Sequence, residues 1–576
     1  MIGTERVKTD SPRRPDRSIL RRCAAVLALV LIGTIAAADS GMTRKAKPST
    51  VTVIGMAGSS LTAVAPALHD TASASTSSGD PYARCTAGRS HAGVIYPATR
   101  VEPWLASDPH EGGHLIGVFQ QDRWSDGGSR GLVASWSFDG GGTWGFTPLP
   151  FSRCADAAYA GKALPFERAS DPWVSIGPDG TAYASGLAFD ARDHRNAVVA
   201  ATSSDGGMTW HNQQTVIVDR DGDPAAPFND KDSVTADPRH PGTAYLVWDR
   251  VSTTDCGADE GLRPRRKSTP PPEHFKPPCS AGPAYLSMTT DGGRHWDRPR
   301  PIVYADIDQQ TVANQIVVDS GTGTLYNFYD FLTPTDRSGD DMTAEIRLVF
   351  STDRGRSWSP PQIVASALSV GVSDPRNHRH HLRTGDVIPE PAIDPITGSL
   401  YIAWQDARYT GMRSDVVVVS TSSQRGLTGT WTRPVRVDMP EDRAAFTPGI
   451  SIDRSGEVAI DYYAIGDPRR DLALLPVERS LRISGRPLVR AGVDGFPFAR
   501  FNFGPPVHLG GPFNMLAAPN AGGFFTGDYE GLAADADAFH AYFAQAACHM
   551  ASCVVAPAAG AVDATDITAV RAPRRQ

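Results

Sequence analysis

Four copies of one eight-residue pattern constrain this chain more than any other feature. They read SFDGGGTW (137–144), SSDGGMTW (203–210), TTDGGRHW (289–296) and STDRGRSW (351–358). In each copy the Asp carboxylate can accept hydrogen bonds from nearby backbone N–H groups, the Gly tolerates positive φ, and the Trp packs beneath the turn. Each copy therefore predicts a tight turn between two strands, whose aspartate is structural rather than catalytic: Asp139, Asp205, Asp291 and Asp353.

A second, longer repeat accompanies these turns. Each copy has a short apolar strand, a turn usually rich in Asp, Gly or Pro, and an aromatic-rich strand, which is the pattern of a β-hairpin. The seven copies are 102–123, 171–190, 230–250, 314–331, 390–408, 447–467 and 527–546. An eight-residue turn follows each of the first four copies, and a degraded one, 420–431, follows the fifth. The sequence therefore predicts an all-β chain built from four-stranded antiparallel units.

Repeated units of this kind are the blades of a β-propeller. The eight-residue turn is the Asp-box, or BNR repeat, and the chain resembles the sialidase-like Asp-box β-propeller family. Sialidases have six blades, whereas the seven hairpins here favour seven blades over six. We expect the propeller to occupy residues 84–558.

The N-terminus has the pattern of an export signal. Five arginines between positions 13 and 22 precede the apolar run 23–38, which is shorter than the roughly 20 residues that a spanning helix needs. We expect 1–38 to be a signal peptide, with an uncleaved signal anchor as the alternative, and the protein to be extracellular or on the cell surface. Residues 39–83 are rich in Ser, Thr and Ala and predict a flexible linker, and 559–576 predict a flexible C-terminal tail.

The charge and the cysteines fit this destination. The chain has 56 basic and 63 acidic residues, a net charge of −7, and an acidic chain argues against nucleic acid as the main partner. We expect a monomer that meets a membrane only through an uncleaved N-terminal segment. Six cysteines lie outside the signal, an even number that fits an oxidising compartment. Proximity in the sequence favours the pairs Cys256–Cys279 and Cys548–Cys553, which leaves Cys85 to pair with Cys154.

The expected blade layout also indicates where a ligand would bind. The starts of the first strands and the ends of the second strands share the face opposite the repeated turns, and propeller ligands usually bind there. The chain concentrates carboxylates and arginines at these positions. They form either a ligand site or a lattice of ion pairs that ties the inner strands together. The candidate substrate-binding arginines are Arg100, Arg123, Arg168, Arg250 and Arg408.

The resemblance to sialidases implies roles for some of these residues. RVEP (100–103) stands where the family has an Arg-Ile-Pro motif, whose arginine grips the substrate carboxylate. Asp126 is similar in place to the acid/base aspartate, Glu390 to a glutamate that opens an inner strand, and Tyr529 to the nucleophile. The implied activity is an exo-α-sialidase-like hydrolysis of terminal sialic acid, or a similar acidic sugar, from a glycan or glycoconjugate by a retaining mechanism with a tyrosine nucleophile. The alternative is a secreted or cell-surface propeller that binds glycan or protein without turnover.

Three further segments have more than one interpretation. No cofactor is expected. However, VDRDGD (218–223) has an aspartate at every second position, Asp219, Asp221 and Asp223, as short calcium-binding loops do. The alternative is an acidic, glycine-containing turn. HRHH (378–381), beside Arg376 and Arg383, is suited to a metal or an acidic ligand, or is a solvated loop. The Pro-rich insertion 252–283 is expected to overhang the ligand face.

Overall fold

A computed structural model describes most of the chain after residue 78. The described residues are 79–89, 93–192, 195–219, 227–254, 279–335, 342–386, 388–422, 430–466, 474–492, 496–546 and 565–574. The predicted signal, most of the predicted linker, Cys256, Cys548, Cys553, Asp221 and Asp223 lie outside these ranges. Within them, no helix has the length and apolarity that crossing a bilayer requires.

Antiparallel sheets follow one another in chain order. The first contains β1 (Ile95–Ser107), β2 (Leu115–Trp124), β3 (Ser129–Ser137) and β4 (Gly145–Pro148), and the second contains β5 (Arg168–Ile176), β6 (Ala182–Phe189), β7 (Asn196–Ser203) and β8 (His211–Asp219). A single residue pair, Ser129 with Ala169, joins β3 to β5 and so links these two groups of strands into one eight-stranded sheet, whose halves are called the first and second sheets below. The third contains β9 (Phe228–Ala236), β10 (Ala244–Thr254), β12 (Ala284–Thr289) and β13 (Arg300–Val303), with the short β11 (Cys279–Ala281) beside β10. The fourth contains β14 (Gln310–Val318), β15 (Leu325–Pro334), β16 (Met342–Ser351) and β17 (Gln362–Ala367).

The second half of the chain continues this pattern and adds two small sheets. The fifth sheet contains β20 (Glu390–Ile393), β21 (Leu400–Asp406), β22 (Val416–Thr421) and β23 (Val435–Arg436), and the sixth contains β24 (Ala444–Ile452), β25 (Val458–Ile465), β26 (Pro476–Ser484) and β29 (Val507–Asn514). The last sheet has three described strands, β31 (Gly531–Ala534), β32 (Ala538–Ala546) and β33 (Thr565–Pro573). The small sheets are β18 (Val372–Asp374) with β19 (Asn377–Arg383) and β30 (Phe524–Phe525), and β27 (Leu488–Arg490) with β28 (Phe498–Arg500).

The predicted hairpins are all present as antiparallel strand pairs. They are β1–β2, β5–β6, β9–β10, β14–β15, β20–β21, β24–β25 and β31–β32. Their alternation of apolar side chains, together with the Asp- and Gly-containing turns, is local information, and that information specifies a hairpin directly.

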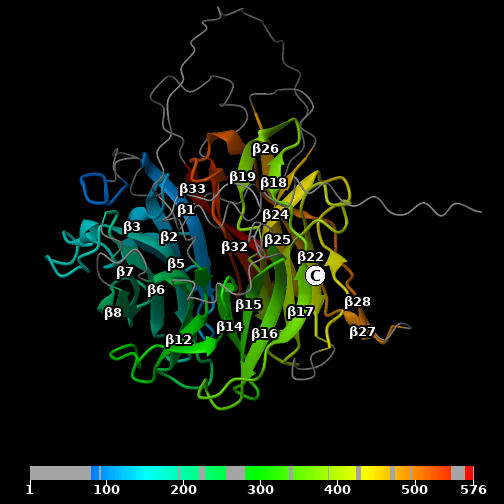
Figure 1. Cartoon of the computed structure of the whole chain (residues 1–576), viewed down its shortest axis with the longest axis horizontal. Coiled ribbons are helices and arrows are strands. Elements are labelled where there is room, and N and C mark those ends of the chain that lie inside the picture. The colour runs from blue at the N-terminus through cyan, green and yellow to red at the C-terminus, as the bar shows by residue number, and fades with distance from the viewer. Residues whose placement is uncertain are drawn as a thin grey trace, which may run out of the picture.

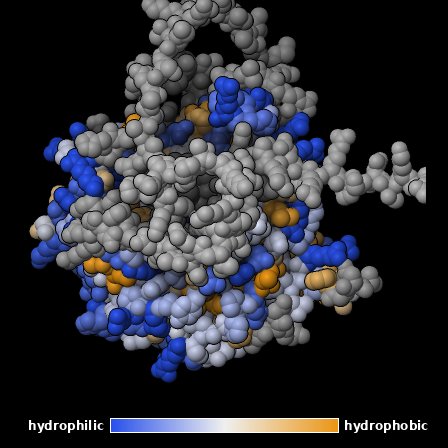
Figure 2. Space-filling model, viewed as in Figure 1, coloured by the Kyte–Doolittle hydropathy of each residue, from blue (hydrophilic) through white to orange (hydrophobic). Residues whose placement is uncertain are grey.

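Apolar side chains between successive sheets form the core. The first strands lie against one another in sequence, β1 against β5, β5 against β9 and β9 against β14, and β31 lies against both β24 and β1. One cluster joins the last sheet to the first, with Tyr542 and Ile567 packed against Leu105 and Val133. Figure 1 shows β33 beside β1, although the two strands are at opposite ends of the described chain. On the face shown in Figure 2, hydrophobic residues appear as separate spots rather than one continuous area.

The four repeated turns have the hydrogen bonds that the pattern predicts. In the first turn, Asp139 accepts from the backbone N of Thr143 at 2.8 Å and from its hydroxyl at 2.7 Å. The same contacts recur at Asp205, Asp291 and Asp353, where the seventh residue of the pattern is Thr209, His295 and Ser357. The Ser357 hydroxyl lowers the pKa of Asp353 to about 2. These carboxylates therefore hold turns together.

The predicted flexibility of two segments, the linker 39–83 and the tail 559–576, is wrong for the residues of each that the structure describes. Residues 565–573 of the expected tail form β33, because each of them pairs with a residue of β32 and so completes the last sheet. At the end of the expected linker, Tyr82 is buried and its hydroxyl donates to the Leu132 carbonyl at 2.6 Å. The predicted disulfide Cys85–Cys154 is present and fastens this segment to the first sheet. Composition missed both segments because tertiary contacts order them.

Candidate functional site

The first strands of five sheets have a bulge at the same place. The register of β1, β5, β9, β14 and β24 shifts there. The residues at the shifts have positive φ: Glu102 (52°), Asp171 (54°), Lys231 (48°), Ala313 (57°) and Thr447 (47°). This conformation costs a non-glycine residue about 1–3 kcal/mol and is typical of functional sites, and a bulge re-aims side chains. Three of the five residues are charged, and their side chains meet.

Lys231 is the centre of this charge cluster. Its Nζ lies 2.7 Å from Asp528 Oδ2, 3.4 Å from Asp171 Oδ2 and 3.7 Å from Glu102 Oε1. Burial lowers the pKa of Lys231, but these carboxylates outweigh burial and hold the pKa well above its ordinary value. The cluster therefore joins the first, second, third and last sheets around one ammonium group.

Two arginines enter the same cluster. Arg383, at the end of β19, donates from Nε to Asp528 Oδ1 at 2.9 Å, and its guanidinium lies 4.6 Å from the centre of the Phe525 ring. The Arg123 guanidinium lies 4.9 Å from the same ring and donates to Gln120 Oε1 at 2.8 Å. Arg123 is buried, its Nε has no hydrogen-bond partner among the described residues, and no described carboxylate forms an ion pair with it. Arg123 thus has donor capacity for an anionic ligand.

The carboxyl groups around Lys231 differ in protonation. Burial raises the pKa of Glu102 to about 8. The positive charge of Lys231 opposes this rise, whereas the negative charge of Asp171 adds to it. Asp528 is buried too, but Arg383 and Lys231 hold its pKa far below the usual range. Neighbouring carboxyls whose pKa values are pushed apart are the pattern of acid/base assignments in enzyme sites. Burial thus favours the protonated form of Glu102, whereas Arg383 and Lys231 favour the ionised form of Asp528.

Tyr529 lies against the cluster and is packed by two tryptophans. The Trp104 and Trp173 rings stack with centroids 3.6 Å apart, and the Tyr529 ring lies edge-on to Trp173 at 5.2 Å. Lys231 Nζ is 5.8 Å from the Tyr529 ring centre, and the Tyr529 hydroxyl donates to the Pro172 carbonyl at 3.3 Å. Burial, followed by the charge of Glu102, raises the pKa of Tyr529 well above its ordinary value.

Most of the other predicted site residues are in separate contacts. Four of the predicted arginines each pair with a nearby carboxylate: Arg100 with Asp566 at 3.0 Å, Arg168 with Asp126 at 2.9 Å, Arg250 with Asp219 at 2.6 Å and Arg408 with Asp406 at 2.7 Å. The pairs Arg250–Asp219 and Arg408–Asp406 fit the interpretation of the ligand face as a lattice of ion pairs. Asp126, the predicted acid/base group, is thereby held against Arg168, and Asp219 against Arg250.

Glu390 is also apart from the Lys231 cluster. It is buried and accepts a 3.5 Å hydrogen bond from Gln315, and burial raises its pKa well above the ordinary value. The charges of Asp461 and Arg479, on the sixth sheet, act on it as well. The structure therefore brings Arg123 and Tyr529 together, with Glu102 rather than Glu390 as the nearby glutamate. The catalytic and binding roles of the predicted residues stay predictions.

Lys231 was not predicted as a site residue, and Arg383 was named only beside HRHH (378–381), as part of a segment suited to a metal or an acidic ligand. Lys231 occupies the bulge that Glu102 and Asp171 occupy in their sheets, so aligning the seven hairpins by their first strands would have found it. Arg383 closes the run NHRHHLR (377–383), whose solvated-loop interpretation is wrong, because these residues form β19 and reach β30. That contact joins segments about 140 positions apart, and no local pattern shows it.

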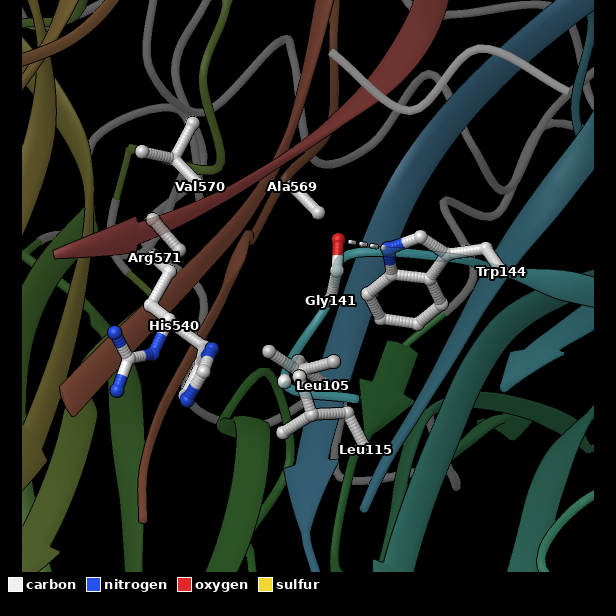
Figure 3. A pocket seen from close by; sticks show the side chains of 10 residues that line it. Leu105, Leu115, Gly141, Trp144, His540, Ala569, Val570 and Arg571 are labelled. Carbon is white, nitrogen blue, oxygen red and sulfur yellow. Dashed lines mark hydrogen bonds between the residues drawn. The ribbon is translucent and has the colours of Figure 1, made fainter. Parts of the chain in front are cut away.

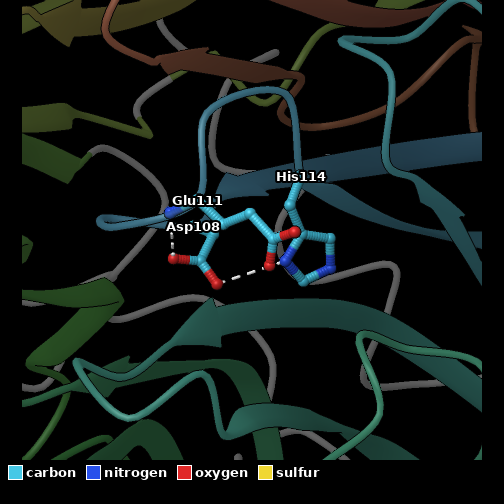
Figure 4. Close-up of side chains that lie close together, drawn as sticks. All are labelled: Asp108, Glu111 and His114. Carbon is cyan, nitrogen blue, oxygen red and sulfur yellow. Dashed lines mark hydrogen bonds and ion pairs between the residues drawn. The ribbon is translucent and has the colours of Figure 1, made fainter.

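A group that resembles a metal site is better explained as a turn. Asp108, Glu111 and His114 bring one ligand atom each within 4.8 Å of one another (Figure 4). However, His114 uses both ring nitrogens, one with Asp108 at 3.2 Å and one with the Gly206 carbonyl at 3.1 Å. Asp108, in the turn of the first hairpin, accepts hydrogen bonds from the backbone N–H groups two and three residues on. The equivalent aspartates in the turns of other hairpins accept the same pair of bonds: Asp319, Asp394 and Asp535. The group is thus a repeated turn.

A small cavity lies between the first and last sheets. Figure 3 shows Leu105, Leu115 and Trp144 on one side and Val570 on the other, with Trp144 donating to the Gly141 carbonyl at 3.0 Å. Its ionisable His540 pairs with Asp535 at 2.8 Å. Arg571 lines the cavity as well, but the lining has none of the buried carboxylates that converge in the Lys231 cluster.

Comparisons with known proteins identify glycosidases at low similarity. No protein-family model and no curated protein matches the chain. An α-L-arabinofuranosidase from Fusarium graminearum is 14% identical, covering 65% of this chain and 91% of that one, with a TM-score of 0.39. A Penicillium chrysogenum α-L-arabinanase is 13% identical (65% and 92% covered, TM-score 0.39), and a Hadza microbial sialidase is 15% identical (81% and 74% covered, TM-score 0.39). Because these scores are below 0.5, the functional argument rests on the site.

Proposed function

We propose that the protein is an exported, sialidase-like glycoside hydrolase that releases a terminal acidic sugar at the Lys231 cluster. One observation carries the proposal: Lys231 and Arg383 reach further toward solvent than the carboxylates that they contact. The side chains of Lys231 and Arg383 are 13% and 16% exposed, whereas those of Glu102 and Asp528 are 1% and 5% exposed. A ligand that reaches Lys231 and Arg383 meets positive charge, and the carboxylate of an acidic sugar suits it.

The fold supports the same proposal. We take six successive groups of four strands, the first two of which are the halves of the eight-stranded sheet, and the last, three-stranded sheet as seven blades of a closed β-propeller. The contacts of β31 with both β24 and β1, and the apolar cluster between the last and first sheets, favour closure. The Cys85–Cys154 disulfide fits an exported protein, because disulfides persist in oxidising compartments.

The proposed chemistry divides the cluster into two parts. Arg123, Arg383 and Lys231 hold the sugar carboxylate, for which guanidinium groups have matching geometry. Tyr529 is the nucleophile of a retaining reaction, and a neutral nucleophile avoids bringing an anion toward that carboxylate. Glu102 takes the tyrosine proton as the tyrosyl–sugar bond forms and the glycosidic bond breaks, because its pKa of about 8 lies close to working pH. The leaving oxygen takes a proton from water. A second water then hydrolyses the tyrosyl–sugar bond, and Glu102 returns the proton to Tyr529. Glu102 thus takes the part that the sequence suggested for Glu390.

A second candidate function is binding of an acidic glycan without turnover. The ion pairs of Arg100, Arg168, Arg250 and Arg408 favour it, because these arginines were expected at the substrate. The two candidates share one ligand chemistry and differ only in turnover.

A fluorogenic sialoside distinguishes them. We expect wild type to release the fluorophore, Tyr529→Phe to lose at least about a hundredfold in kcat, and Arg383→Lys to raise KM about tenfold through loss of charge-assisted hydrogen bonds. Arg356→Gln, which removes an exposed arginine in the fourth repeated turn, is the control and should match wild type. If folded wild type binds the sialoside without releasing fluorophore, hydrolysis is refuted and the binding function remains.

A further inference from the structure

The sixth sheet contains an insertion that forms a hairpin of its own. Residues 485–506 connect β26 to β29, the third and fourth strands of that sheet, and they contain β27 and β28. In each of the first four sheets the same connection is a repeated turn. Because the strands are antiparallel, this connection lies at the opposite end of a sheet from the strand starts that form the Lys231 cluster. Figure 1 shows β27 and β28 at the right-hand edge of the described chain.

One face of this hairpin packs on the protein. Ala499 of β28 is buried, and the ring of Phe501, which follows β28, lies edge-on to Tyr401 of the fifth sheet with centroids 6.5 Å apart. Just before β27, Arg486 donates from Nε to the buried carboxylate of Asp394 at 2.6 Å. These contacts hold the hairpin against the fifth sheet, so its position is fixed.

The other face of the hairpin mixes exposed apolar side chains with cations. The register of β27 with β28 is unbroken over three pairs, Leu488 with Arg500, Val489 with Ala499 and Arg490 with Phe498. Cross-strand partners share a face and successive residues alternate between faces. The face opposite Ala499 therefore carries Leu488, Arg490, Phe498 and Arg500. Leu488 is 57% exposed and Phe498 is 43% exposed, and both arginines are exposed as well.

The groups on this face have no use within the part of the chain that the structure describes. Neither Arg490 nor Arg500 forms an ion pair with a described carboxylate. Phe496, two residues before Phe498, adds a further ring that is 62% exposed. Exposed apolar side chains that gather in one place mark interaction sites on soluble proteins. We therefore expect this face to have an outside partner.

The charges of this face argue for one kind of partner. A second copy packed face to face would bring the arginines of both copies together without a described anion between them, which disfavours self-association. An acidic glycan would pair with the arginines but has no apolar group to cover Leu488. An anionic lipid surface suits both: its phosphates accept hydrogen bonds from guanidinium groups, and the boundary of its acyl chains takes up leucine and phenylalanine.

We propose that the β27–β28 hairpin binds the surface of an anionic lipid bilayer. Leu488 and Phe498 enter the boundary between headgroups and acyl chains, and Arg490 and Arg500 contact the phosphates. This contact does not depend on the proposed hydrolysis, and it differs from the membrane contact that the sequence predicts for the N-terminal segment. Because the hairpin lies at the other end of the sheets, the Lys231 cluster faces away from the bilayer.

Sedimentation with lipid vesicles tests the charge of the contact. The full chain is mixed with vesicles of phosphatidylcholine, with or without phosphatidylglycerol, and the N-terminal segment is the same in every variant. We expect wild type to bind the anionic vesicles at least about tenfold more tightly. The double variant Arg490→Gln/Arg500→Gln should lose about tenfold or more, because each arginine near an anionic surface contributes about fivefold. The charge-matched control Arg298→Gln/Arg356→Gln, at exposed positions, should bind like wild type.

A tryptophan at position 498 tests insertion at this face directly. On anionic vesicles, the emission of Phe498→Trp should shift to the blue and be quenched by brominated acyl chains more than that of wild type, because the added indole enters the bilayer. Tyr304→Trp is the matched control, since Tyr304 is 79% exposed in the connection between β13 and β14, at the end with the Lys231 cluster. It should gain neither signal. Circular dichroism checks the folding of every variant.

Each of the following results overturns the proposal. They are equal binding to neutral and anionic vesicles, unchanged binding of Arg490→Gln/Arg500→Gln, and quenching of Phe498→Trp no greater than that of wild type. Binding to polygalacturonate that the arginine variant loses, without binding to vesicles, assigns the face to an acidic glycan instead. A dimer in sedimentation velocity that Phe498→Ser dissociates assigns it to a second copy of the chain.

Discussion

Replacing Glu102 by Gln should stabilise the protein at high pH while abolishing its activity. Glu102 is 1% exposed, sits at a strained bulge, and accepts a hydrogen bond from Gln120 Nε2 through one carboxyl oxygen. A glutamine has the same shape as a protonated glutamate and keeps that acceptor. It cannot ionise, so it removes the cost of a buried negative charge beside Asp171.

The size of the effect follows from proton linkage. Burial raises the pKa of Glu102 from 4.5 to about 8. Below pH 4.5 the carboxyl is protonated in both folded and unfolded chains. Between pH 4.5 and 8 only the folded chain keeps the proton, so the free energy of unfolding falls as pH rises, by about 1.4 kcal/mol per pH unit from this group. Above pH 8 both states are ionised and the loss is complete. Between pH 5 and pH 8 the loss is on the order of 4 kcal/mol.

Urea unfolding of wild type and Glu102→Gln at pH 5 and pH 8 measures this loss. We expect the two proteins to be similar at pH 5, and the variant to be more stable at pH 8 by roughly 2–4 kcal/mol. Titrating groups that do not interact with Glu102 cancel in the difference. Glu111→Gln, at an exposed position, serves as the control and should show no pH-dependent gain. A Glu102→Gln variant that is equally or less stable than wild type at pH 8 would refute the reasoning.

Four further outcomes test other parts of the account. The kcat/KM of wild type should rise with pH toward about 8, because the proposed base Glu102 acts in its ionised form; a falling pH–rate profile would contradict this role. Cys85→Ser should lower the free energy of unfolding by about 2–4 kcal/mol through loss of the bond to Cys154, which closes 69 positions, as urea unfolding would show. Arg479→Met leaves a fully buried carboxylate unpaired and should cost about 3–5 kcal/mol; a neutral effect in thermal unfolding would disprove it. Asp205→Ala removes the hydrogen bonds of one repeated turn and should cost about 1–2 kcal/mol without changing kcat of the folded enzyme.

Local pattern was enough to predict the hairpins and the turns. The alternating apolar residues and the Asp-Gly turns act over a few positions, so hairpins such as β5–β6 and turns such as the one at Asp139 could be read from the chain. The Cys85–Cys154 pair followed by elimination from the same reading. Composition failed at 565–573, because a strand at the end of a chain depends on a partner strand that composition does not describe.

The candidate site was only partly predictable. Arg123 and Tyr529 were expected at the ligand face and do lie in the cluster, but Arg100, Arg250 and Arg408 were expected there and pair with carboxylates instead. The repeat pattern predicted which residues start or end the inner strands. It could not say which carboxylate each arginine would meet, because pairing depends on distances of a few ångströms between neighbouring sheets.

The sequence by itself therefore determined the repeating unit: seven hairpins, four structural turns and the polar start of each first strand. Only the tertiary structure decided that three of those starts, Glu102, Asp171 and Lys231, meet at aligned bulges, and that β19 carries Arg383 to Asp528. The physical reason is range. Hydrogen bonds within a turn join residues about four positions apart, whereas the cluster depends on sheets whose packing brings residues hundreds of positions apart into one buried, low-dielectric place.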